Sequence, residues 1–157
     1  MIDPGGSQLL GALSADGGLL ALFLVSFLAS TVLPLGSEWL LVAVILQSHE
    51  PWPAVAVATI GNSLGALTTY LLGFWGGEWL TTRILRMSGA ERRRAAALFQ
   101  RYGSWSLLLT WVPVVGDPLC LVAGALRTGL TRFLILMVAG KLARYAAVAW
   151  LVLAAGS

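Results

Sequence analysis

Four ionisable residues lie within stretches of sequence that are otherwise almost entirely apolar: Glu38, Asp117, Lys141 and Arg144. Lys141 and Arg144 are three positions apart, so they share one face of a helix. Charged groups at membrane depth are costly and usually mark a substrate or proton path. An arginine can offer a phosphate two parallel hydrogen bonds, and a lysine adds a point charge. Lys141 and Arg144 are therefore predicted to bind an anionic substrate such as a phosphate.

The two carboxylates have a predicted role beside the cations. Burial favours the neutral form of an unpaired carboxylate, so Glu38 and Asp117 could take up and release protons as the substrate enters and leaves. Two acids also balance two bases, and a structural salt-bridge cluster would explain the same residues. Both interpretations stay open at this point.

The composition indicates which solvent surrounds these charges. Of the 157 residues, 58% are hydrophobic and 11% are charged, whereas soluble domains carry about a quarter charged residues. Such a chain has too little polar surface to face water on all sides, so lipid must be its outer solvent. We expect an all-α integral membrane protein with one membrane domain, 1–157, and no enzymatic activity, because neither Ser37 nor Cys120 has a visible base.

The rarer residue types exclude several classes of site. A single cysteine, Cys120, excludes an intramolecular disulfide and a thiolate metal cluster, and a single histidine, His49, excludes a histidine metal site. We therefore predict no metal and no cofactor. The basic residues have a better explanation in membrane topology than in nucleic-acid binding, so we predict no nucleic-acid partner.

The apolar residues fall into two kinds of segment. After a polar lead-in, 1–18, two segments (53–75 and 131–154) are long enough to span a bilayer. Two others, 19–47 and 104–127, are interrupted. Proline and glycine break helices, and irregular backbone at membrane depth must be buried or line a wet cavity. We therefore predict re-entrant hairpins with Glu38 and Asp117 at their tips, a kinked helix being the alternative. The breaking residues are Pro34, Gly36, Pro113, Gly116 and Pro118.

Both halves of the chain have the same order, a broken hairpin and then a spanning helix, which indicates an internal repeat. Between the spanning helices, 77–103 is predicted to form cytoplasmic amphipathic helices. The positive-inside rule places the arginines of this region in the cytoplasm. The hairpins then enter from opposite sides as inverted repeats, a plan typical of secondary transporters. These arginines are Arg83, Arg86, Arg92, Arg93, Arg94, Arg101, Arg127 and Arg132.

Small residues form a stripe along the first spanning segment. Gly61, Gly65, Thr69 and Gly73 recur every four positions, so another backbone could approach closely. The stripe could serve static packing or a sliding contact, and it could face a hairpin or another copy of the chain. In the segment between the repeats, Ser88 to Glu91 has the spacing of a capping box.

Several motifs occur in order between about Phe27 and Trp150. Together they resemble the short YqaA-like branch of the DedA (VTT) superfamily. That resemblance implies two opposed re-entrant hairpins and a role in lipid movement across bilayers. Glu38 matches the family's membrane-embedded glutamate, whereas Thr110 and Gly116 stand where larger members carry arginines. The motifs are Gly61 to Gly65 (GNSLG), Tyr70 to Gly73 (YLLG), Arg101 to Gly103 (RYG), Trp111 to Cys120 (WVPVVGDPLC), Ala123-Gly124 and Gly140 to Tyr145 (GKLARY).

The expected function follows from these arguments together. We expect a multi-pass protein of the bacterial inner membrane, a DedA-like transporter or flippase for an anionic lipid phosphate of the undecaprenyl phosphate or phospholipid class. Its partners would be membrane lipids, and the glycine stripe leaves open a second copy of the chain as a further partner. The alternatives are a proton- or cation-coupled channel or antiporter, and a structural membrane protein whose charges only lock the bundle.

Overall fold

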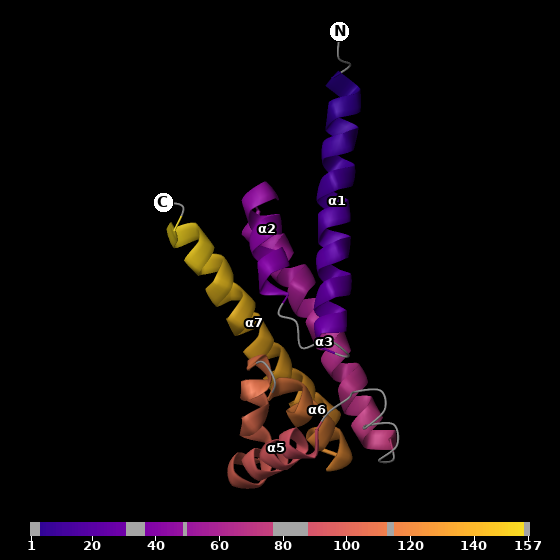
Figure 1. The fold of residues 1–157 in the computed structure, drawn as a ribbon, viewed down its shortest axis with the longest axis vertical. Coiled ribbons are helices and arrows are strands. Elements are labelled where there is room, and N and C mark those ends of the chain that lie inside the picture. Colours follow the sequence, from indigo (N-terminus) through magenta and orange to yellow (C-terminus); the bar gives the residue numbers. More distant parts are fainter. Residues whose placement is uncertain (1–3, 31–36, 49, 77–87, 113–114, 156–157) are drawn as a thin grey trace.

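The computed structural model describes residues 4–30, 37–48, 50–76, 88–112 and 115–155, and all regular elements in these ranges are helices (Figure 1). This agrees with the all-α prediction. The elements are α1 (Pro4–Ala29), α2 (Glu38–Ser48), α3 (Pro51–Trp75), α5 (Gly89–Tyr102), the 3-10 helix η1 (Gly103–Trp111), α6 (Gly116–Ala125) and α7 (Leu130–Ala155).

The two longest apolar segments form α3 and α7. Among the described helices, these two are long and apolar enough to cross a membrane, and their bounds lie within two residues of the predicted spans. Only 28% of the most apolar window of α7 is buried inside the molecule. The rest of that surface faces outward, where lipid rather than water is the favourable solvent.

The first helix is longer than predicted. α1 begins at Pro4, so the helix extends through most of the expected polar lead-in, 1–18, before it enters the apolar segment that begins at residue 19. Proline suits the first turn of a helix, where its missing N–H would have had no partner. At 26 residues, α1 is about 39 Å long and extends beyond α2 (Figure 1).

The predicted helix breaks are only partly described. Pro34, Gly36 and Pro113 lie outside the described residues. η1 ends at Trp111, and Gly116 and Pro118 lie in the first turn of α6, the helix that follows the predicted break. A first-turn proline is tolerated because the N–H that it lacks would be unpaired there. Gly116 allows a close approach, since a Cβ there would lie 2.1 Å from the Thr110 carbonyl oxygen.

The first arm of the second predicted hairpin is a 3-10 helix of nine residues, η1. Runs of this length are uncommon, because the hydrogen-bond geometry is poorer than in an α-helix. Two hydroxyls return to carbonyls three residues earlier: Ser106 donates to the Gly103 oxygen (2.7 Å) and Thr110 to the Leu107 oxygen (2.7 Å). These bonds support the three-residue turn.

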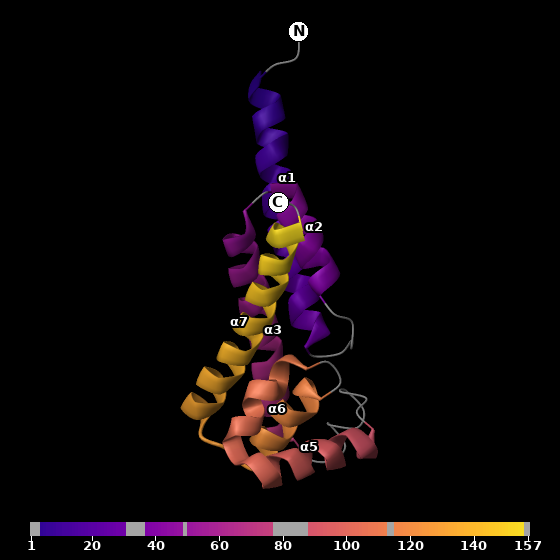
Figure 2. The same ribbon diagram turned by 90° about the vertical axis from the view of Figure 1, so that its left-hand side faces the viewer.

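The amphipathic helix α5 forms as its capping signals predict. The Ser88 hydroxyl accepts from the Glu91 N–H, and the Glu91 carboxylate accepts from the Ser88 N–H at 2.7 Å. At the other end, Gly103 adopts φ 57°, which glycine reaches without strain. α5 lies across the end of the molecule where α3 ends and α7 begins (Figure 2), in contact with η1 and α6.

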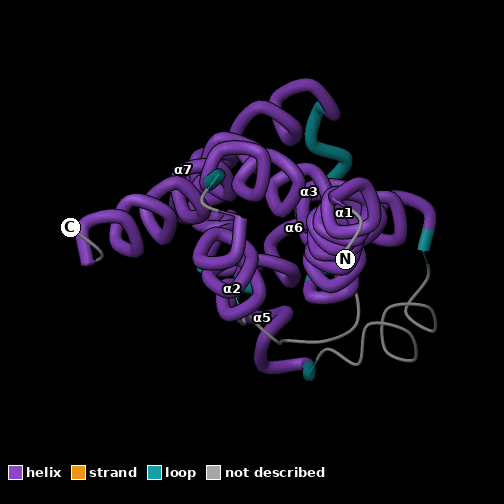
Figure 3. The backbone as a smooth tube through the Cα atoms, turned by 90° about the horizontal axis from the view of Figure 1, so that it is seen from above, coloured by secondary structure: helices purple, strands orange, loops and turns teal. Residues whose placement is uncertain are grey.

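The glycine stripe of α3 contacts the arms of both predicted hairpins. A Cβ on Gly61 would lie 2.5 Å from the Phe23 carbonyl oxygen of α1, and one on Gly73 would lie 2.2 Å from the Leu121 oxygen of α6. Gly65 faces α1 in the same way. The stripe therefore lets two other helices pack closely against α3 within a single copy of the chain. Seen from above, α7 slants away from α1 (Figure 3).

Two apolar cores share the long helices α3 and α7. One core joins them to α1 and α2, with Leu22, Leu41, Ala58 and Tyr145 among its members. The other joins them to η1 and α6. On α3 the cores are separated between Ala58 and Ala66, and on α7 between Met137 and Tyr145. The two gaps contain Asn62 on α3 and Lys141 and Arg144 on α7, and these polar and charged residues belong to the candidate site.

Candidate functional site

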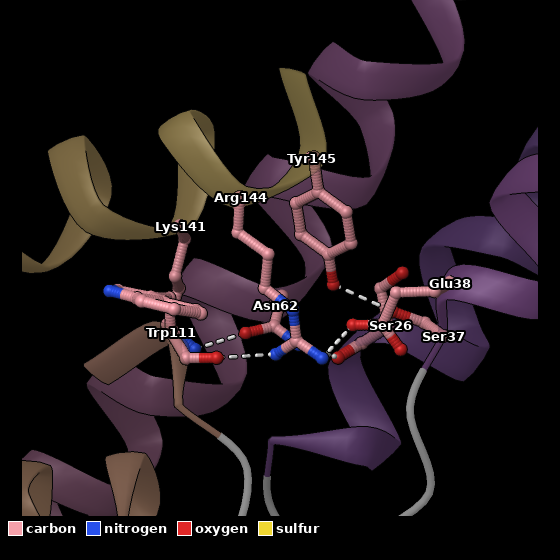
Figure 4. A network of polar contacts seen from close by, with 8 residues as sticks. All are labelled: Ser26, Ser37, Glu38, Asn62, Trp111, Lys141, Arg144 and Tyr145. Carbon is pink, nitrogen blue, oxygen red and sulfur yellow. Dashed lines mark hydrogen bonds and ion pairs between the residues drawn. The ribbon is translucent and has the colours of Figure 1, made fainter. Parts of the chain in front are cut away.

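A polar layer lies between the two cores, at mid-length of both long helices. Asn62 comes from α3 and Lys141 from α7, and the Lys141 ammonium donates a hydrogen bond to the Asn62 side-chain oxygen. Each follows a glycine, Gly61 or Gly140, that packs against the backbone of a neighbouring helix. The glycines bring the helices close, so the next residue in each points into the interior of the bundle (Figure 4).

The deepest part of this layer is a cluster around Lys141, whose side chain is 3% exposed. Besides Asn62, the ammonium donates to the Ser30 hydroxyl at 3.1 Å. That hydroxyl in turn donates to Asp117 at 2.9 Å. Ser30 thus links the cation of α7 to the carboxylate of α6. We name Ser30, Asn62, Asp117 and Lys141 the buried cluster.

Backbone groups complete the surroundings of this cluster. The Asn62 amide donates to the Ser26 carbonyl at 3.1 Å, and the Thr69 hydroxyl donates to the Ser30 carbonyl at 3.2 Å. Both acceptors lie at the end of α1, where carbonyls lack partners within the helix. The α3 side chains therefore hold the end of α1 in the position that directs Ser30 toward Lys141.

Arg144 makes a second, more open contact with the other carboxylate. One guanidinium nitrogen forms an ion pair with Glu38, the first residue of α2, and the other donates to the Trp111 carbonyl at 2.7 Å (Figure 4). The side chains of Arg144 and Glu38 are 21% and 25% exposed. Arg144 thus joins the beginning of α2 to the end of η1. We name Glu38 and Arg144 the open pair.

Tyr145 borders the open pair on the same helix. Its hydroxyl and that of Ser37 lie 2.6 Å apart in a buried hydrogen bond, and Ser37 directly precedes Glu38. The ring belongs to the core formed with α1 and α2. Tyr145 therefore fixes the beginning of α2, and with it the Glu38 carboxylate, against α7.

A cavity of about 400 Å³ lies between η1 and α7 and is lined at one end by Arg144. Its other walls are mostly apolar, among them Leu108, Trp111 and Ala143. Its size falls within the usual range for small-ligand pockets. The open pair therefore borders a space that could hold part of an amphiphilic molecule, whereas the buried cluster is enclosed by its own partners.

The structure brings together all four ionisable residues singled out in the sequence, in two separate contacts. Lys141 and Arg144 lie on one helix but are linked to different carboxylates: Arg144 pairs directly with Glu38, whereas Lys141 reaches Asp117 through the Ser30 hydroxyl. The contributions of Ser30, Ser37 and Tyr145 were not predicted. A signal for them existed, because a serine in an apolar helix needs a polar partner when it is buried.

The site offers ion pairing and hydrogen bonding rather than metal chemistry. In the described ranges, no three histidine, cysteine or acidic side chains come together as metal ligands would. Cys120 is a buried free thiol in the core formed with η1 and α6.

Comparison with known proteins identifies relatives of the whole arrangement. The VTT-domain family model matches residues 33–153. The inner membrane protein YqaA of Escherichia coli is 44% identical over 132 residues, which cover 83% of this chain and 88% of YqaA. An uncharacterized protein of Haemophilus influenzae is 36% identical over 83% of this chain and 84% of its own. No solved structure matches.

The family match begins after α1 and includes Glu38, Asn62, Asp117, Lys141 and Arg144. The name of the Escherichia coli relative supports a place in the inner membrane, and the family is one of membrane proteins. The all-helical fold and the two helices of spanning length agree with it. The chain therefore belongs to the VTT-domain (DedA) family of membrane proteins.

Proposed function

We propose that this protein is a transporter or flippase that moves an anionic lipid phosphate, of the undecaprenyl phosphate or phospholipid class, across the bilayer. The observation that carries the proposal is the open pair. At mid-length of an apolar helix, Arg144 stays 21% exposed beside a cavity. A cation at this depth that is accessible from outside the bundle costs free energy. Such residues usually mark the path of a substrate or an ion.

The geometry of Arg144 suits exchange between the carboxylate and a phosphate. Two of its nitrogens are in use, one on Glu38 and one on the Trp111 carbonyl. A phosphate could accept two parallel bonds from the guanidinium and replace Glu38. The released carboxylate would then gain a proton, which would couple the passage of the lipid to proton movement. Asp117 and Lys141 would support the site from the buried cluster.

We further infer that two inverted repeats create this site. Within the halves, α1 packs on α3 and η1 packs on α7; between them, α6 packs on α3, and α2 packs on α7 as well as on α3. The pairs Gly61-Asn62 and Gly140-Lys141 occupy matching places on the two long helices. Re-entrant hairpins entering from opposite sides, with the arginine-rich segment in the cytoplasm, account for this exchange of partners.

Flipping of labelled lipids in liposomes tests the proposal. The full chain is reconstituted and assayed with labelled undecaprenyl phosphate and phosphatidylglycerol, comparing the wild type with Arg144→Gln and Glu38→Gln. We expect each variant to slow flipping about tenfold or more. Arg94→Gln, on the exposed face of α5, removes the same charge and is expected to remain within about twofold of the wild type.

Two results would contradict the proposal. One is a wild type that flips none of these lipids. The other is flipping by Arg144→Gln at the wild-type rate in folded protein. A proton- or cation-coupled channel or antiporter would instead show ion flux in vesicles of neutral lipid alone, and the same reconstituted samples measure this with a pH-sensitive dye inside the vesicles.

A further inference from the structure

A second cavity lies between η1 and α7, toward α5. It measures about 530 Å³ and is lined by Trp105, Arg132 and Ile135, among others. The cavity beside Arg144 is bounded by the later residues of the same two elements. Along η1 the linings pass from 103–105 to 108 and 111, and along α7 from 131–136 to 139–147. The two cavities therefore lie in succession along the same pair of elements, on either side of the close contact between Gly140 and the Leu108 backbone, and together they are called the groove below.

The α7 wall of this groove is one stripe of the helix. Its members recur at intervals of three and four residues, as positions on one helical face do: Arg132, Ile135, Leu136, Ala139, Gly140, Ala143, Arg144 and Ala147. Beside the site the stripe consists of alanine and glycine, so no large side chain fills the space. From Arg132 to Arg144 the helix rises about 18 Å.

The chemistry of the groove changes along its length. At its α5 end, exposed Arg132 and Thr131 lie near Trp105, which is 70% exposed. Tryptophan with an arginine is typical of the level of lipid headgroups. Between the two arginines the lining is mainly apolar, as with Ile135 and Leu108. The groove thus has a cation at each end and an apolar middle.

We propose that this groove, the η1–α7 groove, is the path by which an anionic phospholipid from the leaflet beside α5 reaches Arg144. Its phosphate passes from Arg132 to Arg144 while its acyl chains remain in the surrounding bilayer. Both arginines complement the charge of the phosphate, and the apolar lining suits the part of the lipid next to it. The inference rests on the proposed function and adds to it the direction of access.

A pair of neighbouring substitutions tests the path. Ala143→Trp fills the groove, whereas Leu142→Trp places the same side chain on an exposed neighbouring position that lines neither cavity. With labelled phosphatidylglycerol we expect Ala143→Trp to slow flipping about tenfold or more. Leu142→Trp is expected to stay within about twofold of the wild type. Equal flipping by the two folded variants would overturn the groove while leaving the proposed transport intact.

Photo-crosslinking separates the path from the transport itself. Phosphatidylglycerol with a photoreactive group near its phosphate is added to the reconstituted full chain, and mass spectrometry maps the labelled peptides. We expect labelling of 102–111 and 131–147, reduced by Ala143→Trp and not by Leu142→Trp. This result would support the groove even if the wild type flipped no lipid. Labelling spread evenly over all exposed helices would overturn it.

Discussion

The buried cluster and the open pair contain one acid and one base each, yet their surroundings differ. Lys141 is 3% exposed and is satisfied by Asn62 and Ser30. Arg144 is 21% exposed and borders a cavity. Two cations three positions apart on one helix thus differ in their exposure and in their partners. An enclosed cation with neutral partners holds helices together, while one with an open side remains available to a ligand.

The largest expected effect comes from removing the enclosed charge. Lys141→Met leaves Asp117 buried without a compensating cation, and we expect it to lower the free energy of unfolding by about 3 kcal/mol or more. Arg144→Met breaks the more open pair, so we expect a smaller loss than for Lys141→Met. Unfolding of the purified protein in lipid–detergent bicelles measures both.

A double replacement sharpens this first prediction. Lys141→Met combined with Asp117→Asn removes both charges, and the double variant should be more stable than Lys141→Met alone. If the two single replacements at Lys141 and Arg144 were equally destabilising, the distinction between the buried cluster and the open pair would fail.

A smaller effect is expected at the glycine that positions Ser30. A Cβ on Gly65 would lie 2.5 Å from the Phe27 carbonyl oxygen and 2.9 Å from the Ser30 Cβ. Gly65→Ala must push α1 away and should cost about 1–3 kcal/mol. Gly129→Ala is the matched control, because a Cβ there meets nothing within 4 Å. Thermal unfolding compares them, and equal midpoints would contradict the role of Gly65.

The smallest expected effect is at the hydroxyl beside the open pair. Tyr145→Phe keeps the buried ring but removes the bond to Ser37, which should cost about 1 kcal/mol of stability. Because Ser37 precedes Glu38, the same change should also loosen α2 at its start, which hydrogen exchange of α2 amides measures. Unchanged exchange there would show that the hydroxyl does not hold the open pair.

The fold was predictable where local rules decide it. The spanning segments followed from apolar length, and the beginning and end of α5 followed from Ser88, Glu91 and Gly103. The extent of α1 was not predictable in this way, since polar residues near its start resemble a lead-in. Nor does composition separate a 3-10 helix from an α-helix, because that choice in η1 depends on packing.

The site was predictable in its charges but not in its connections. The free-energy cost of placing a charged side chain in lipid singles out four residues of the sequence: Glu38, Asp117, Lys141 and Arg144. Which acid contacts which base depends on how the helices meet, and the glycines at 61, 65 and 140 control that contact. The spacing of residues in the sequence predicts which of them share a face of one helix. It does not predict that Ser30, from another helix, contacts Lys141 on that face.

The 3-10 form of η1 has a mechanical consequence. Nine residues extend about 18 Å at the 3-10 rise, against about 14 Å in an α-helix. Rewinding this arm would therefore withdraw the Trp111 carbonyl from Arg144 by about 4 Å without melting a single turn. In its extended 3-10 form, η1 is long enough for the Trp111 carbonyl to accept the hydrogen bond from Arg144.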